Sequence, residues 1–255
     1  MQASDATSTD ENFAASRAAA AIVGWSFAYV STTGSTNADL AERARAGDRR
    51  PALLTTDHQT AGRGRLGRTW EDDGESQLMV SFSIPVTGPA TWVAGAVAAA
   101  ARDVVAAAGA PVGFKWPNDL MIESTAVSGK LAGVLAEFVP GDPDVVIVGM
   151  GLNIGPPGID GAASLREVGA TIERDELLAG IIARLPTLVA DPDLVRSSLT
   201  DHSVTLGRRV RVEQSSGAFV GTATAFDQEG RLVVDVDGES RVVAVGDVIH
   251  LRAEG

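Results

Sequence analysis

The chain has 255 residues, a formal net charge of −12 and no cysteine. Without cysteine it can hold no disulfide, thiolate metal site or cysteine nucleophile, which fits a cytoplasmic protein. Arg102 and Asp103 interrupt the alanine-rich stretch 90–110, so it is no membrane span, and the polar residues 1–12 are no signal peptide. The acidic charge also argues against a nucleic-acid-binding protein, which usually carries a basic surface.

In chain order, hydrophobic periodicity predicts alternating helices and strands over residues 13–200, after a polar start that is predicted to be disordered over 1–12. The predicted helices are 13–23, 40–46, 91–108 and 173–190, and the predicted strands are 25–30, 52–56, 78–84, 120–122, 131–138 and 145–148. Ser35 or Thr36 is expected to cap the second helix, and Pro186 to bend or break the last. Apolar and polar residues alternate over 78–84, which predicts a half-buried strand.

The pattern changes near Asp201, where we place a domain boundary. Short apolar runs then recur at intervals punctuated by turn residues, which is typical of a small β-barrel or β-sandwich. The predicted strands of this region are 204–212, 218–226, 232–236, 241–245 and 248–251. The sequence thus predicts an α+β domain over 13–200 and a small all-β domain over 201–255.

A long glycine-rich loop lies between the predicted strands 52–56 and 78–84. Its segment His58–Trp70 reads HQTAGRGRLGRTW, with three arginines within six residues. A guanidinium group can bind two phosphate oxygens at once, and glycine lets backbone N–H groups come close to a phosphate. Gly62, Gly64 and Gly67 match the dinucleotide-binding pattern G-x-G-x-x-G, and Gly62–Thr69 fits the P-loop pattern with Arg68 in place of its lysine. No amphipathic helix follows, as both patterns would require. A solvated arginine loop and a nucleic-acid arm remain alternatives.

Lysine is rare in this chain. Of its 21 basic residues only Lys115 and Lys130 are lysines, and the rest are arginines. A biased base composition explains the arginines, but a retained lysine is of interest because its ammonium group is a compact point charge rather than a planar fork. We therefore take both lysines as candidates for a function.

Five short motifs occur in a characteristic order. They are Ser35-Thr36-Asn37, Gly62–Trp70 (GRGRLGRTW), Lys115–Asp119 (KWPND), Lys130–Gly133 (KLAG) and Gly151–Ile154 (GLNI). Together they resemble the motifs of biotin–protein ligases. The resemblance implies a mixed-sheet catalytic domain of the biotin/lipoate ligase type and a small C-terminal SH3-like β-barrel. Only 34 residues precede Ser35, too few for the DNA-binding winged helix of larger members, so the short form without a repressor role is expected.

The resemblance also implies a two-step reaction. ATP would activate biotin to biotinyl-5′-AMP with release of pyrophosphate and the help of Mg²⁺, and biotin would then pass to a lysine of a biotin carboxyl carrier domain of an acyl-CoA or pyruvate carboxylase. No nucleic-acid or membrane partner is expected, and neither the oligomeric state nor the Mg²⁺ ligands are predicted. A lipoate ligase is the nearest alternative, and a non-catalytic binder, such as a biotin sensor or an RNA-binding module, is the alternative from another class.

Individual roles follow from the same resemblance. The biotin-binding residues would be Ser35, Thr36, Asn37, Gln59, Gly62, Arg63, Lys130 and Gly133. The residues that bind ATP or the adenylate would be Arg65, Arg68, Trp70, Asn118, Asp119 and Asn153. Lys130, Arg63 and Arg65 would be catalytic, because they would neutralise the repulsion between a carboxylate and a triphosphate. Plain structural roles remain open for Trp70, Trp116, Asp119 and Asn153, and Glu137 is left unassigned. The three histidines match no metal-ligand spacing.

Overall fold

The structure is a computed structural model that describes residues 12–70, 76–86, 90–214, 217–244 and 246–251. The expectation of disorder over 1–12 therefore falls, except for Asn12, outside the described residues. Among the described residues, no helix is long and apolar enough to cross a membrane.

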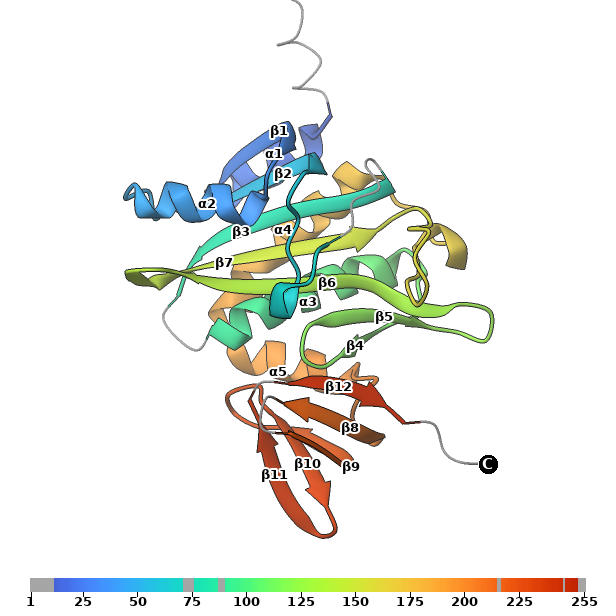
Figure 1. Ribbon diagram of the computed structural model, residues 1–255. Helices are drawn as coiled ribbons and strands as arrows, with labels where there is room; N and C mark the ends of the chain where they lie inside the picture. The colour runs from blue at the N-terminus through green and yellow to red at the C-terminus, as the bar shows by residue number, and fades with distance from the viewer. Residues whose placement is uncertain (1–11, 71–75, 87–89, 215–216, 245, 252–255) are drawn as a thin grey trace, which may run out of the picture.

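A mixed sheet of seven strands forms the first domain (Figure 1). Its strands are β1 Ser26–Thr33, β2 Ala52–Gln59, β3 Gln77–Pro85, β4 Val112–Lys115, β5 Asp119–Glu123, β6 Ser128–Val139 and β7 Asp142–Asn153, in the order β1-β2-β3-β7-β6-β5-β4. Only β1 and β2 pair in parallel; the other neighbours are antiparallel. Long hydrophobic runs in β3, β6 and β7 place these strands at the centre of the sheet.

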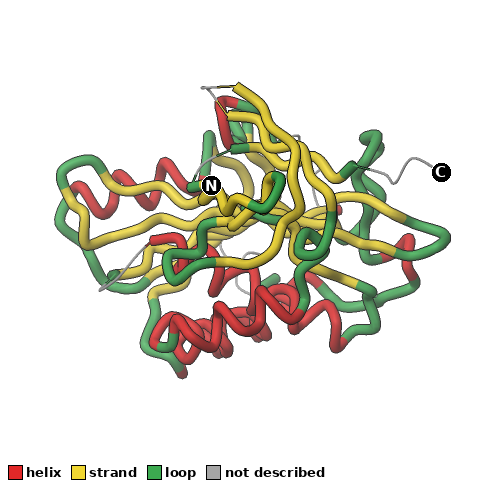
Figure 2. Tube along the Cα trace, turned by 90° about the horizontal axis from the view of Figure 1, so that it is seen from below, coloured by secondary structure: helices red, strands yellow, loops and turns green. Residues whose placement is uncertain are grey.

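Helices cover the two faces of this sheet unequally. Most of them gather along one face, as Figure 2 shows. Those that contribute to the large core there are α1 Ala14–Ile22, α3 Ala90–Ala107, α4 Arg174–Ala190 and α5 Pro192–Asp201. On the other face α2, Thr36–Arg45, packs Leu40 and Ala44 on a smaller cluster that includes Leu54 and Ile147. One helix cannot cover seven strands, so the rest of this face is left for a loop and a cavity.

The second domain is a five-stranded antiparallel sheet. Its strands are β8 Arg209–Gln214, β9 Gly217–Phe226, β10 Leu232–Val236, β11 Glu239–Val243 and β12 Asp247–His250, in the order β11-β10-β9-β8-β12. It is fixed to the first domain by two indole N–H groups: Trp92 donates to the carbonyl of Gln228 (2.9 Å) and Trp116 to that of Gly230 (3.0 Å). Apolar residues of both domains share one core. The tryptophans thus pack at a domain junction.

Most predicted elements are present, with five corrections. The short strand β4 and the helix α5 were not predicted. Pro186 does not break α4, which is continuous from Arg174 to Ala190. Ser35 holds the N-cap position of α2, but its side chain makes no capping hydrogen bond. Finally, β3 is buried on both faces rather than half-buried, because α2 covers the face that carries its polar residues.

Candidate functional site

A cavity of about 390 Å³ opens on the face of the sheet that α2 leaves uncovered. Its walls come from the N-terminus of α2, the loop after β2, the middle of β6 and β7, and β12 of the second domain. The loop crosses this face of the sheet in Figure 1. The lining contains every residue assigned above to a binding site except Gly62 and Asn153. The motifs that are scattered over the sequence therefore converge on one cavity.

The arginine loop is a short hairpin. Arg63 and Thr69 form an antiparallel bridge, the amide of Gly64 donates to the carbonyl of Arg68 (2.7 Å), and that of Trp70 donates to the carbonyl of Gly62 (3.1 Å). At the tip, Leu66 (φ 56°) and Gly67 (φ 75°) have left-handed backbone conformations. Only glycine adopts such a conformation without strain, which explains Gly67. Gly62 thus supports the hairpin through its backbone rather than lining the cavity.

Trp70 lies flat against the sheet because glycines stand beneath it. A Cβ atom on Gly151 would lie 2.2 Å from Cε2 of Trp70, and one on Gly133 would lie 3.2 Å from Cζ3. The indole N–H donates to Oε1 of Gln77 (3.0 Å), which fixes the ring in its plane. Glycine inside a strand commonly marks a close approach of another group, and here that group is an aromatic ring.

Lys130 reaches into the cavity from β6. Its Nζ atom lies 2.7 Å from Oδ1 of Asp119 and 5.5 Å from the ring centroid of Trp70. Asn153 does not line the cavity; it is buried, and its amide donates to the backbone carbonyls of Lys130 (3.2 Å) and Ala163 (3.1 Å). Asn153 therefore joins the strand that carries Lys130 to the segment at Ala163.

Two loop arginines reach the second domain. Arg65 donates to Oδ1 of Asn118 (3.1 Å) and lies 3.9 Å from Oδ1 of Asp247, and Arg68 pairs with the same aspartate. Burial lowers the pKa of Arg65 from its ordinary value, while Asp247 opposes the shift. Asp247 thus joins β12 to the loop over the cavity.

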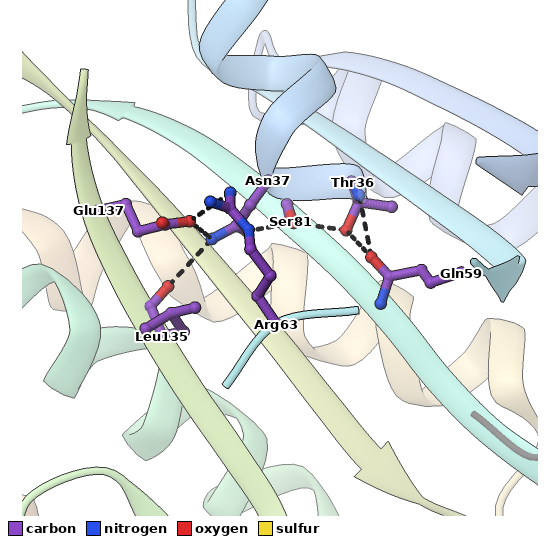
Figure 3. A network of polar contacts seen from close by, with 7 residues as sticks. All are labelled: Thr36, Asn37, Gln59, Arg63, Ser81, Leu135 and Glu137. Atoms are coloured by element: carbon purple, nitrogen blue, oxygen red, sulfur yellow. Dashed lines mark hydrogen bonds and ion pairs between the residues drawn. The ribbon is translucent and has the colours of Figure 1, made fainter. Parts of the chain in front are cut away.

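A chain of polar side chains borders the other end of the cavity (Figure 3). Gln59 accepts through Oε1 from the backbone amide of Thr36 (2.9 Å), and the hydroxyl groups of Thr36 and Ser81 lie 2.7 Å apart. The chain continues through Asn37, whose Oδ1 accepts from Ser81 (2.6 Å), to the carboxylate of Glu137. These groups are neutral except Glu137, whose charge is paired with that of Arg63 at 3.0 Å, so this end suits a polar, uncharged ligand group.

The chain matches known proteins over both domains. The sequence profile of the biotin/lipoate A/B protein ligase family matches residues 29–153, and that of the biotin protein ligase C terminal domain matches 205–251. A biotin–[acetyl-CoA-carboxylase] ligase of Mycobacterium tuberculosis is 38% identical over an alignment 242 positions long that covers 88% of each protein. The chain belongs to the biotin/lipoate protein ligase family.

Other members of the family agree with this assignment. The bifunctional ligase/repressor of Escherichia coli is 29% identical and is matched over 91% of this chain and 76% of its own length. The biotin protein ligase of Aquifex aeolicus, solved in complex with biotin and ATP, superposes with a TM-score of 0.74 at 23% identity, over 89% of this chain and 99% of that one. The predicted fold class, a mixed-sheet ligase domain with a small C-terminal β domain, is confirmed.

Sequence reasoning missed two residues that contact the predicted site of this ligase. Glu137 binds both Asn37 and Arg63, and its place at the end of a predicted strand was noted without a role. Asp247 lies some 180 positions after the arginines it contacts, and nothing local in the sequence indicated it. Among the described residues, no group of three or more histidine or carboxylate side chains is arranged to hold a metal ion.

Gly151→Ala tests whether the ligase needs a flat Trp70. The added methyl group would overlap the indole, so the ring must tilt out of the cavity wall. Overpacking of this kind costs about 1 to 3 kcal/mol, so we expect the KM for ATP to rise about tenfold, measured by pyrophosphate release. Gly34→Ala is the control, because a methyl group there would meet no atom within 4 Å. An unchanged KM for ATP in Gly151→Ala would refute a contact between the Trp70 ring and the bound nucleotide.

Proposed function

We propose that this ligase activates biotin with ATP and then attaches it to a lysine of the biotin carrier domain of a carboxylase. An oxygen of the biotin carboxylate forms a bond to the α-phosphorus of ATP, and pyrophosphate leaves with the electrons of the broken P–O bond. The lysine amine of the carrier then attacks the carbonyl carbon of the mixed anhydride. AMP leaves with the electrons of the C–O bond, and the amine loses a proton.

The observation that supports this proposal is the division of one cavity into two chemically different ends. Gln59, Thr36 and Asn37 provide neutral amide and hydroxyl groups at one end. Lys130 and Arg65 bring positive charge to the other. A biotin molecule has the matching polarity, since its ureido group is neutral and hydrogen-bonding and its carboxylate is anionic.

The cationic end accounts for the chemistry of the first step. A carboxylate and a triphosphate repel each other, and a fixed ammonium group between them lowers that repulsion as charge develops on the α-phosphoryl oxygens. Lys130 is held for this task by Asp119 and by its place on the central strand β6, so little reorganisation is needed. Trp70 offers a flat face beside it for the adenine base.

Mg²⁺ would enter with the nucleotide. It commonly binds through phosphate oxygens with only one or two protein carboxylates, so it needs no cluster of acidic side chains. Asp119 is the carboxylate beside Lys130 in the cavity, and we assign no further metal ligand. When bound, Mg²⁺ would neutralise charge on the phosphates.

The neutral end favours biotin over lipoate. Lipoate carries an apolar dithiolane ring in place of the ureido group, and it would leave the polar groups of this end without partners. A site that is built to hydrogen-bond its substrate rejects an analogue without those groups by about 10⁴-fold or more. Titration calorimetry with both acids separates these alternatives, and tight binding of lipoate alone would exclude the biotin assignment.

Pyrophosphate release that requires both biotin and ATP is the direct test of the first step. For the second step, an isolated biotin carrier domain from acetyl-CoA carboxylase is incubated with enzyme, biotin and ATP, and its mass is measured. A carrier with arginine at the acceptor position is the control and should stay unmodified. Biotin binding without pyrophosphate release would instead favour the non-catalytic binder.

A repressor role is not part of this proposal. Binding to DNA depends on the neutralisation of phosphates by basic residues, and the chain carries a net charge of −12. We expect no retardation of duplex DNA at physiological salt in a mobility-shift assay with enzyme up to about 1 µM, the lower limit of typical non-specific dissociation constants. Retardation at sub-micromolar enzyme, with or without biotin, would contradict this.

A further inference from the structure

Glu137 ends the polar chain of Figure 3 and belongs to no motif discussed above. One of its oxygens, Oε2, accepts from Nδ2 of Asn37 at 2.6 Å and from Nη2 of Arg63 at 3.0 Å. Asn37 is buried, whereas the Arg63 side chain is about half exposed. The carboxylate therefore joins the start of α2 to the arginine loop at the edge of the cavity.

Two acceptors determine which way the Asn37 amide points: the Glu137 carboxylate at 2.6 Å and, more weakly, the backbone carbonyl of Leu135 at 3.4 Å. A carboxylate only accepts hydrogen bonds, so Asn37 must turn its NH₂ group toward Glu137. Its Oδ1 atom then faces Ser81, whose hydroxyl hydrogen must point to it across 2.6 Å. Gly149 makes this arrangement possible, because a Cβ atom there would lie 2.3 Å from Oδ1 of Asn37.

This direction continues to the cavity wall. Since the hydroxyl hydrogen of Ser81 is engaged with Asn37, the 2.7 Å contact with Ser81 takes the single hydroxyl hydrogen of Thr36, in preference to the longer contact of that hydroxyl with Oε1 of Gln59 at 3.1 Å. The backbone N–H of Thr36 donates to Oε1 of Gln59, so the Gln59 amide turns its NH₂ group to the side of Met79, 3.6 Å from Sδ. The links from Asn37 to Thr36 thus take their direction from the acceptors at the Glu137 end, whereas the backbone amide of Thr36 sets the orientation of Gln59.

We propose that Glu137 is a positioning residue for the biotin end of the cavity. It orients the Asn37 amide, and through it the hydroxyl groups of Ser81 and Thr36, while it also holds Arg63 over the ligand. This inference rests on the proposed function, because it assumes that biotin occupies the neutral end. It predicts a selective defect: biotin binding suffers and nucleotide binding does not.

A purely structural role predicts something different. A partly exposed ion pair such as Arg63–Glu137 contributes little to stability, so its loss alone should hardly change either the melting temperature or the kinetics. Glu123 offers a matched comparison: it pairs with Arg208 at 2.5 Å, and its side chain is 31% exposed against 32% for Glu137. It lies on β5, outside the cavity lining.

The test compares Glu137→Gln with Glu123→Gln. Glutamine keeps the size of the side chain but can turn its own NH₂ group toward Asn37, so only the longer contact with the carbonyl of Leu135 still favours the original direction of the chain. We expect the KM for biotin of Glu137→Gln to rise about tenfold, the loss of one charge-assisted hydrogen bond, with the KM for ATP changed less than about twofold. Glu123→Gln should match the wild type in both. Equal rises in both KM values, or none, would overturn the proposal.

A double-mutant cycle gives a second readout. If Glu137 acts through Asn37, then Glu137→Gln should add little to the loss of biotin affinity already caused by Asn37→Ala. Affinity is measured by calorimetry with biotin alone, which does not depend on turnover. Fully additive losses would refute the positioning role. Wild-type enzyme that binds biotin without releasing pyrophosphate would refute the proposed reaction but leave this comparison intact, and absence of biotin binding would refute both.

Discussion

Replacement of Lys130 by methionine is expected to slow biotin-dependent pyrophosphate release by about 10²- to 10³-fold, the usual cost of losing one preorganised charged donor. Methionine keeps most of the volume and contact with Trp70 but removes the ammonium group that lies 2.7 Å from Asp119. Alanine should cause a similar loss. The measurement is single-turnover pyrophosphate release at saturating biotin and ATP, with the melting temperature recorded for each variant.

Lys130→Arg is the informative companion. Arginine restores the charge, but its planar fork is larger and does not place the charge at the same point, so we expect poor rescue. If either neutral variant keeps near-normal release, Lys130 is not the group that stabilises the transition state. A full recovery by arginine would mean that charge alone matters, without a defined position.

Arg65→Gly should separate formation of the adenylate from its retention. The Arg65 side chain contacts Asn118 and Asp247 from the loop over the cavity. Its loss should shift the loop toward an open state by about 5- to 150-fold, as expected for one charge-assisted hydrogen bond. Lys130 and Arg63 remain, so adenylation should continue while the reactive intermediate escapes and acylates lysines at random.

The measurement uses an unrelated bystander protein. Enzyme, biotin, ATP and the bystander are mixed, and biotin on the bystander is detected by blotting. Asp247→Asn should produce the same labelling to a smaller extent, because the contact of Arg65 with Asn118 would persist. Pyrophosphate release without bystander labelling would show that Arg65 does not retain the adenylate, and loss of both signals would place Arg65 in the chemical step.

The sequence predicted much of the candidate site because its residues lie in short motifs. The loop Gly62–Trp70 and the segment around Lys130 each carry several lining residues within a few positions, so local reading was sufficient. The same holds for the central strands, whose apolar runs are long. By contrast, β4 has four residues and merges with the motif that begins at Lys115, so it gave no separate hydrophobic pattern.

The features of the site that could not be predicted from the sequence depend on contacts between distant parts of the chain. The serines of β3 looked solvent-facing, yet α2 covers that face and Ser81 binds Asn37 there. The ion pairs of Asp247 join residues of two domains, and hydrophobic periodicity contains no information about them. The glycines of β7, by contrast, were a usable signal in the sequence. Gly149 and Gly151 alternate along this strand, which indicates a face on which other side chains pack closely.

The contact of Asp247 with the loop arginines has a consequence for the exchange of domains between this protein and its relatives. The C-terminal sheet has its own strands and turns, and it invites exchange with the equivalent piece of a relative. Yet β12 supplies a wall of the cavity and the anion that holds the loop tip. A hybrid enzyme would therefore fold but release its activated intermediate, which would then react with any nearby amine. To retain the intermediate, the donor sheet would need an acidic side chain at the position of Asp247.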